Sequence, residues 1–404
     1  MIKTEVVTLG LGYIGLPTSA LLAKNGTKVL GVDIDKNIVD IINKGKIHIV
    51  EPSLDEIVFN AVSKGNLRAS LKPTIADVFL IVVPTPFKQN HEPDIRFIET
   101  ATESVIPFLK EGDLFIIEST SPVGTTEKIK NLIFKHKPQL EDKIYIAYCP
   151  ERVLPGNIMH ELVNNDRVIG GINEISTQKA VEFYSKYVLG NLHPTNARTA
   201  EMCKLVENSS RDIQIAFANE LSMICEKANI NVWELIGLAN KHPRVNILQP
   251  GSGVGGHCIA VDPYFIVSDY PSESKIIRTS REVNNFKPVW CIEKIELEKN
   301  RFESKYGRVP KIALMGLAFK PDIDDLRESP AEFIVKKLFK KFNKEDLYIV
   351  EPNIKSHSIF EIKKYEEAIE SSDIIVFLVA HKEFKKPKLN KSQFLIDFCG
   401  ITNK

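Results

Sequence analysis

The stretch TEVVTLGLGYIG, residues 4–15, decides the fold. Its apolar first half, Thr4–Leu9, predicts a strand, and the spacing of apolar residues over Tyr13–Lys24 predicts a helix. Between them, Gly10 permits a tight turn, Gly12 lets a ligand approach the backbone, and Gly15 lets the helix pack on the strand. The helix N-terminus favours the phosphates of a dinucleotide. A tight turn without a ligand is the alternative.

A second predicted strand, Lys28–Val32, ends at Asp33. A carboxylate at this place accepts hydrogen bonds from both ribose hydroxyls and repels a 2′-phosphate, which favours NAD over NADP. Two later strands, Val78–Val83 and Leu114–Glu118, are each followed by a loop with a hydroxyl side chain, Thr85 after Pro84 in the first and Thr120 in the second. Ligands of α/β sheets lie at such strand ends, although each loop taken alone could be only a turn.

Strand and helix signals alternate through the first third of the chain and again from Val309. An uninterrupted helical pattern from Thr199 to about Asn229 separates these parts. The sequence therefore predicts an α/β protein with two Rossmann-like parallel-sheet domains joined by a central helical segment with one long helix. The expected boundaries are residues 1–195 for NAD binding, 196–300 for the helical segment and 301–404 for a second α/β domain.

The composition is that of an ordinary globular protein, with 43% hydrophobic and 26% charged residues and a net charge of +1. The near-zero net charge gives no general affinity for nucleic acid or an anionic membrane. The longest apolar runs have about seven residues, against roughly 20 for a transmembrane helix, and no signal peptide precedes the first strand, so we expect a cytoplasmic location. The six scattered cysteines lack metal-ligand spacing and are expected to be thiols without a metal.

Cys258 is the candidate nucleophile, because it ends a loop with four glycines among residues 251–256. Such a loop lets the backbone come close to a ligand, and a cysteine that opens a helix is stabilised as thiolate by the helix dipole. Asp262 would share its helical face, and Lys204 and Asn208 share a face of the long helix. Together they could form an oxyanion site for a sulfur adduct. A buried cysteine beside a flexible loop and two ordinary polar helix residues are the alternatives.

Eight longer motifs follow one another along the chain: GLGYIGLP, STSPVGTTEKI, YCPERVLPGN, NDRVIGG, RTAEMCKLVENSSRD, NKHPRVNILQPG, GVGGHCIAVDPYF and LAFKPDIDDLRESPA. In this order they resemble the motifs of the nucleotide-sugar 6-dehydrogenases. The similarity runs from the first strand to about Pro330 and continues more loosely to the C-terminus.

The resemblance implies a four-electron oxidation of a sugar C6 hydroxyl to a carboxylate, with two NAD⁺ consumed. Cys258 would trap the aldehyde as a thiohemiacetal, which becomes a thioester and is hydrolysed. Lys204 and Asn208 would stabilise the oxyanion, and Asp262 would act as acid/base or orient water. Thr120 and Glu151 would position the hydrolytic water and assist proton transfer.

The resemblance also implies binding residues. For the cofactor these are Gly10, Gly12, Tyr13, Ile14, Gly15, Asp33, Pro84, Thr85, Thr120 and Arg327. For the UDP-sugar they are Glu151, Arg152, Val153, Leu154, Lys204, Asn208, Arg211, His242, Arg244, Asn246, Gly255 and Lys320. Arg244 would reach the site of a neighbouring subunit, so we expect a homodimer.

Three positions depart from the UDP-glucose branch: His257 precedes the cysteine, Val261 replaces a lysine and Pro155 replaces an acid. These changes favour a UDP-N-acetylhexosamine as the substrate, with the mannosamine epimer first, the glucosamine epimer as the alternative and UDP-glucose after both. The resemblance further implies that the product serves surface polysaccharide synthesis. Arg211 would contact the acetamido group or form a structural salt bridge. A two-electron hydroxyacid dehydrogenase would need no thiol, and a non-catalytic NAD sensor would need none of Cys258, Lys204, Asn208 and Asp262.

Overall fold

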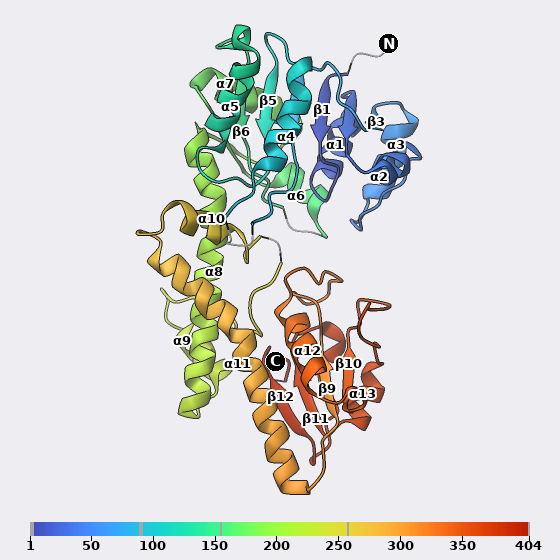
Figure 1. Cartoon of the computed structure of the whole chain (residues 1–404), viewed down its shortest axis with the longest axis vertical. Helices are drawn as coiled ribbons and strands as arrows, with labels where there is room; N and C mark the ends of the chain where they lie inside the picture. Colours follow the sequence, from blue (N-terminus) through green and yellow to red (C-terminus); the bar gives the residue numbers. More distant parts are fainter. Residues whose placement is uncertain (1–3, 89–91, 154–155, 257, 403–404) are drawn as a thin grey trace. The chain divides into compact units, whose positions relative to one another are not determined.

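The computed structural model describes residues 4–88, 92–153, 156–256 and 258–402 (Figure 1). Its backbone contacts divide the chain into two compact units, Met1–Glu207 and Asn208–Lys404. The boundary falls inside one long helix. The three-part division expected from the sequence stays a prediction.

The N-terminal unit contains an eight-stranded sheet in the order β3-β2-β1-β4-β5-β6-β7-β8, counted over the described residues. Neighbouring strands are parallel except β6 and β7. The strand order reverses between β1 and β4, and ligands of such sheets bind at the carboxyl ends beside this reversal. The strands are β1 (Val6–Leu9), β2 (Val29–Val32), β3 (Leu67–Ser70), β4 (Val78–Ile81), β5 (Leu114–Ile117), β6 (Tyr145–Tyr148), β7 (Arg167–Gly171) and β8 (Leu192–Asn196).

Helices cover both faces of this sheet, which is why its central strands read as unbroken apolar runs. One core joins the sheet to α1, α2, α3, α6 and α7, and the other joins it to α4 and α5. The helices are α1 (Gly15–Lys24), α2 (Lys36–Asn43), α3 (Leu54–Ser63), α4 (Arg96–Val105), α5 (Thr125–His136), α6 (Ile158–Asn164) and α7 (Glu174–Tyr184), with 3₁₀ turns η1 (Ile106–Phe108) and η2 (Pro138–Leu140).

Two long helices follow, where the sequence predicted one. The predicted helix is α8 (Ala197–Ala228), and after α9 (Val232–Ala239) and α10 (Asp262–Asp269) comes α11 (Lys275–Tyr306), which also has 32 residues. The sequence pattern missed α11 because Pro288, a residue that usually ends a helix, lies inside it. Among the described residues, no helix combines the length and the apolar character needed to cross a membrane.

The C-terminal unit carries the second predicted Rossmann-like sheet, with parallel strands in the order β10-β9-β11-β12. Residues of α11 and α12 cover one face, and α13 with Phe384 covers the other. The elements are β9 (Ile312–Met315), α12 (Pro330–Lys341), η3 (Lys344–Asp346), β10 (Leu347–Val350), α13 (Tyr365–Ser371), β11 (Ile374–Phe377), η4 (Lys382–Phe384) and β12 (Phe394–Asp397).

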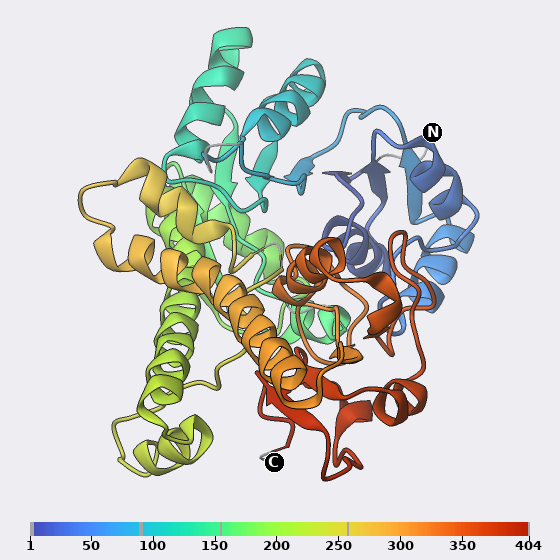
Figure 2. The ribbon, with the colours of Figure 1, turned by 60° about the horizontal axis from the view of Figure 1, so that its bottom comes forward.

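A buried polar network joins α8 to α11, which lie side by side along residues 212–226 (Figures 1 and 2). The carboxylate of Asp212 accepts hydrogen bonds from Arg281 at 2.6 Å and from the Asn284 amide at 2.8 Å. Burial raises the pKa of Asp212, although Arg281 opposes this rise. Asn219 continues the network by donating to Asn284 and accepting from the Gly251 amide, at 2.9 Å in each case. The start of the glycine loop is therefore tied to both helices.

We predict that Arg281→Met lowers the free energy of unfolding by about 3–5 kcal/mol, because it leaves the Asp212 carboxylate buried without its cation. Urea unfolding of the full chain measures this change. The double variant Asp212→Asn/Arg281→Met should recover part of the loss. Arg278→Met, at an exposed arginine of the same helix, is the control and should stay within about 0.5 kcal/mol of the parent. An Arg281→Met variant as stable as this control would contradict the prediction.

Candidate active site

The glycine loop after β1 has the geometry that a dinucleotide needs. Gly10 has φ +91°, and a Cβ on Gly15 would lie 1.8 Å from the carbonyl oxygen of Gly10. A Cβ on Gly12 would meet nothing within 4 Å, so the backbone there is open to a ligand. Asp33 at the end of β2 accepts from the Leu11 amide through Oδ2 at 2.9 Å. This carboxylate therefore fixes the glycine loop. It also lies at the end of β2, where a ribose is expected to bind.

The loops after β4 and β5 are joined at the same sheet edge. The Ser119 hydroxyl donates to the Val83 carbonyl oxygen at 2.7 Å, which sets the following Thr120 beside the Pro84-Thr85 loop. The Thr85 hydroxyl is buried without a hydrogen-bond partner among the described residues, and buried polar atoms normally have one. Tyr13 is exposed and Ile14 half-buried, ahead of α1. These groups suit an NAD site.

Lys204 and Glu151, two predicted catalytic residues, are in contact. The Lys204 ammonium donates to the Glu151 carbonyl oxygen at 2.8 Å. The Glu151 carboxylate accepts from the Arg152 amide at 2.9 Å and lies 3.1 Å from the guanidinium of Arg167. Arg167 is itself buried. Both partners of the Lys204–Glu151 contact belong to the N-terminal unit.

The segment after Glu151 is held by protein groups. Arg152 pairs with Glu207 at 2.7 Å, so its guanidinium is engaged within the chain, and Val153 packs against the core. The predicted contact Leu154 and the departure Pro155 lie outside the described residues. Glu51, which the sequence analysis missed, accepts from the amides of Gly156 and Ile158 at 2.8 and 2.7 Å.

In the C-terminal unit, two residues to which the sequence analysis gave catalytic roles, Asn208 and Asp262, are in contact. The Asn208 amide donates to Asp262 Oδ2 at 2.5 Å, and Asp262 is buried. Cys258 is exposed, and its carbonyl oxygen accepts from the amides of Val261 and Asp262. The expectation that Cys258 opens a helix was wrong: it lies in a turn, and α10 begins at Asp262, where Pro263 suits the first helical turn. His257 lies outside the described residues.

The glycines before Cys258 serve a purpose that the sequence did not indicate. We expected them to let a ligand approach, but three of them pack against the protein. A Cβ on Gly253, Gly255 or Gly256 would come within 3.0 Å of Pro288, Phe319, Pro330 or the Glu328 carbonyl oxygen. Gly251 alone of the four has open space. Gly255 is therefore needed for packing, whatever its part in substrate binding.

The remaining predicted substrate residues are exposed. They are Arg211, His242, Arg244, Asn246 and Lys320. Arg211 forms no salt bridge with another described residue, so the structural alternative for it finds no support. Arg327 forms an ion pair with Asp325 at 2.6 Å, and its carbonyl oxygen accepts from the Gly256 amide at 3.0 Å. This second contact ties the cysteine loop to the loop after β9.

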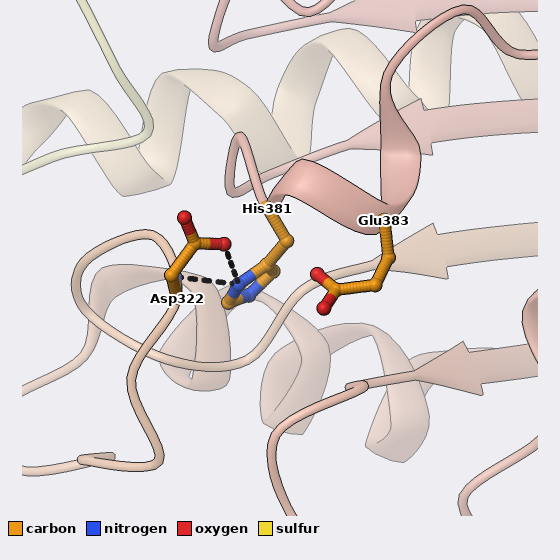
Figure 3. A group of neighbouring side chains, drawn as sticks. All are labelled: Asp322, His381 and Glu383. Carbon is orange, nitrogen blue, oxygen red and sulfur yellow. Dashed lines mark hydrogen bonds and ion pairs between the residues drawn. The ribbon is translucent and has the colours of Figure 1, made fainter.

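Asp322, His381 and Glu383 point toward one another in the C-terminal unit and have the composition of a metal site (Figure 3). Both ring nitrogens of buried His381 are already engaged. Nδ1 accepts from the Asp322 amide and the Asn353 side chain, each at 3.0 Å, and Nε2 lies 3.0 Å from Glu351. No lone pair of the ring is left for an ion, so we assign no metal to this group.

Glu351 is the centre of that network. Its Oε2 also accepts from the amides of Leu317 and Ala318 at 2.7 and 3.0 Å, as Asp33 does from Leu11 in the first sheet. Burial would raise the pKa of Glu351, but the hydrogen bonds from His381 and the backbone amides lower it to about 2. The carboxylate therefore stabilises the loop after β9.

The comparisons with known proteins agree with this geometry. Three models of one family match in order: the NAD binding domain over residues 4–188, the central domain over 198–286 and the UDP binding domain over 313–404. The chain belongs to the UDP-glucose/GDP-mannose dehydrogenase family. It is thus an NAD-dependent oxidoreductase, and both the NAD cofactor and the family resemblance expected from the sequence are confirmed.

Relatives match this family member over nearly its whole length. UDP-N-acetyl-D-mannosamine dehydrogenase of Campylobacter jejuni is 53% identical, with 98% of this chain and 99% of the relative covered. NDP-N-acetyl-D-galactosaminuronic acid dehydrogenase of Ralstonia nicotianae is 49% identical, with 98% and 96% covered. The solved UDP-D-ManNAc dehydrogenase of Pyrococcus horikoshii is 38% identical, covers 98% and 96%, and has a TM-score of 0.88.

Two glycine substitutions separate cofactor binding from folding. We predict that Gly12→Ala leaves the melting temperature nearly unchanged but weakens NAD binding at least about tenfold, because its methyl group fills the open approach to the backbone. Gly15→Ala should lower the free energy of unfolding by about 3 kcal/mol or more, since its Cβ overlaps Gly10. Thermal scans and calorimetric titration with NAD measure both effects. Unchanged NAD affinity in Gly12→Ala would contradict the assignment.

For the second sheet, we predict that Glu351→Gln lowers the free energy of unfolding by about 2–3 kcal/mol at pH 7. The lowered pKa means that the ionised form stabilises the fold above about pH 4.5 and that this contribution is lost toward pH 2. The difference from the parent should therefore shrink below pH 4.

Fluorescence can follow this unfolding, because Trp233 and Trp290, the two tryptophans of the chain, both belong to the C-terminal unit. Glu383→Gln, at an exposed neighbour of His381, is the control. A constant difference between Glu351→Gln and the parent across this pH range would exclude the proposed role of the Glu351 carboxylate.

Proposed function

We propose that this chain oxidises C6 of UDP-N-acetyl-D-mannosamine to the uronate in two NAD-dependent steps, supplying an acidic sugar for surface polysaccharide. The names of the relatives from C. jejuni and P. horikoshii support this substrate. The observation that carries the chemistry is the exposed thiol of Cys258, in the turn before the Asn208–Asp262 pair.

Cys258 explains how the half-oxidised sugar is retained. The first oxidation converts the C6 alcohol to an aldehyde, and the sulfur adds to its carbonyl carbon to give a thiohemiacetal. The second oxidation yields a thioester, which water cleaves to a carboxylate and the free thiol. NAD⁺ accepts the hydride in each oxidation, so two NADH form for each acid. A covalent adduct keeps the aldehyde from leaving between the steps.

The polar residues have distinct roles in this proposal. Lys204 and Asn208 stabilise the oxyanion of the sulfur adduct as cationic and amide donors. Asp262, which accepts from Asn208, exchanges protons with the adduct or orients water. Glu151 and Thr120 position the water that cleaves the thioester. The Glu151 carbonyl oxygen holds Lys204 in place, which supports a joint role.

Substrate contacts follow from charge and exposure. We assign Lys320 to the UDP-sugar and Arg327 to the NAD phosphates, and Arg211 to the acetamido oxygen. The exposed Arg244 serves the site of a partner subunit in a cytoplasmic homodimer. Exposed apolar side chains of α8 and α9 support a dimer: Phe217, Ile224 and Leu238 are 51%, 54% and 64% exposed in one chain.

Product analysis tests the substrate. Purified protein is incubated with NAD and one UDP-sugar at a time, and NADH and acid are counted. We expect two NADH per acid with UDP-N-acetyl-D-mannosamine and little product with the gluco and galacto epimers or with UDP-glucose. The galacto arm is included because of the R. nicotianae relative. One NADH per substrate would indicate a two-electron dehydrogenase. NAD binding without turnover of any sugar would indicate an NAD sensor.

Cys258→Ala tests the nucleophile. We predict that it abolishes acid formation while NAD binds with unchanged affinity, because the cofactor loop lies in another unit of the chain. Acid and NADH assays beside an NAD titration check both statements. Cys399→Ala removes a thiol near the C-terminus and should keep parent activity. Near-normal acid production by Cys258→Ala would rule out the thiol route.

A further inference from the structure

Outside the residues already assigned, the N-terminal unit contains a buried cluster of ionisable groups behind Glu151. Its members come from the ends of β5 and β6, the start of β7 and the region of α7. They are Glu118, Cys149, Arg167, Tyr184 and Tyr187, each at most 8% exposed. Sequence analysis assigned none of them a role in the chemistry.

Arg167 is the only cation of this cluster among the described residues. Its guanidinium lies 3.1 Å from the Glu151 carboxylate, donates to the Leu162 carbonyl oxygen at 3.3 Å and lies 4.9 Å from the Tyr184 ring centroid. It also interacts electrostatically with Glu118. One guanidinium is therefore the positive charge of the cluster for two carboxylates, and its ion pair is with Glu151.

Glu118 is fixed on one side only. Its Oε1 accepts from the Tyr184 hydroxyl at 2.6 Å, whereas its Oε2 is buried without a hydrogen-bond partner among the described residues. A second buried carboxylate on a single guanidinium leaves a net negative charge when both are ionised, which is costly in a low-dielectric interior. Oε2 is the atom on which a proton would relieve this charge.

We propose that Glu118 and Arg167 are positioning residues: Glu118 competes with Glu151 for the guanidinium of Arg167, and its protonation decides how firmly Arg167 holds Glu151. With Glu118 neutral, Arg167 pairs with Glu151 alone. With Glu118 ionised, Arg167 is shared and the two carboxylates repel each other. The inference rests on the proposed part of Glu151 in water activation and in holding Lys204.

The other four members of the cluster do not titrate near neutrality. Burial raises the pKa of Cys149 to about 12 and that of Tyr184 and Tyr187 well above the usual tyrosine value. The pKa of Arg167 is also raised, although burial opposes this, so the guanidinium stays charged. For Glu118, burial raises the pKa to about 7, Arg167 and Tyr184 oppose the rise, and Glu151 adds to it.

The raised pKa of Glu118 makes the free energy of unfolding depend on pH. Between about pH 4.5 and 7 the folded chain binds a proton at Glu118 that the unfolded chain has released. Stability from this group is therefore lost as the pH rises through this window. Glu118→Gln imitates the protonated form and lacks this loss.

The decisive experiment compares the parent, E118Q, R167Q and E118Q/R167Q. E182Q, at an exposed glutamate of α7, is the matched control. Values of kcat with saturating NAD and UDP-N-acetyl-D-mannosamine are measured from pH 5.5 to 9, beside melting temperatures at pH 5 and 8.

We expect an inflection of kcat near pH 7 in the parent and E182Q that is absent from E118Q. R167Q should lose at least about tenfold in kcat with little change in the KM for NAD, because Glu151 is no longer held. E118Q/R167Q should regain about threefold over R167Q, since removal of one buried negative charge relieves Glu151. A purely structural role would not give this rescue. An inflection retained in E118Q, or a double variant no better than R167Q, would overturn the proposal.

The melting temperatures separate this inference from the proposed function. Relative to the parent, E118Q should gain stability between pH 5 and pH 8, whether or not the assay substrate is correct. If the parent oxidises no UDP-sugar but this gain in stability appears, the proposed function is refuted, whereas the titration of Glu118 within the cluster is supported. An equal pH dependence of E118Q and the parent refutes the role of Glu118 even when turnover is normal.

Discussion

The proposed chemistry of this enzyme depends on the tight packing of the backbone before Cys258. Gly253, Gly255 and Gly256 lie so close to neighbouring prolines and to Phe319 that any side chain would collide. The Arg327 carbonyl oxygen holds the Gly256 amide, and the turn after Cys258 leads into the helix whose Asp262 pairs with Asn208. The thiol can thus be exposed while its backbone is fixed, which is what a preorganised nucleophile requires.

In both sheets, a carboxylate at the end of a strand holds a neighbouring loop. Asp33 fixes the glycine loop after β1, and Glu351 does the same after β9 with His381 as an additional partner. An acid at this position of a Rossmann-like sheet is therefore no proof of ribose binding, because its carboxylate can instead accept hydrogen bonds from loop amides alone. In the first sheet, two further features favour a dinucleotide: among the described residues, nothing lies within 4 Å of a Cβ on Gly12, and none is a hydrogen-bond partner of the buried Thr85 hydroxyl.

Local patterns predicted most of the fold. The strands around Gly10, the long helix α8 and the second sheet are found near their predicted residues, because apolar periodicity and turn glycines act over short distances. The second long helix was missed, since Pro288 contradicts a helix locally. The contacts with α8 on either side of Pro288, through Lys287 and Lys294, are not visible in the sequence. The place of Cys258 was also misjudged, because helix α10 starts four residues later, at Asp262.

The site could be predicted only where its residues share a motif or a helix. Asn208 and Asp262, each named from its motif, are in contact. The buried cluster spans 66 residues of sequence, from Glu118 through Glu151 and Arg167 to Tyr184. Its members meet because β5, β6 and β7 are neighbours in the sheet. A carboxylate directly after the apolar run Leu114–Ile117 was the one local sign of that cluster, and it does not reveal its partners.

In the proposed reaction, Cys258 carries the sugar between the two oxidations. Rapid acid quenching during turnover of UDP-N-acetyl-D-mannosamine, followed by mass spectrometry of the peptide that contains Cys258, tests it most directly. We expect a transient sugar adduct on Cys258 that forms and decays at the rate of acid production. Acid formed at the normal rate with no adduct on Cys258 at any time, or with the adduct on another residue, would contradict it.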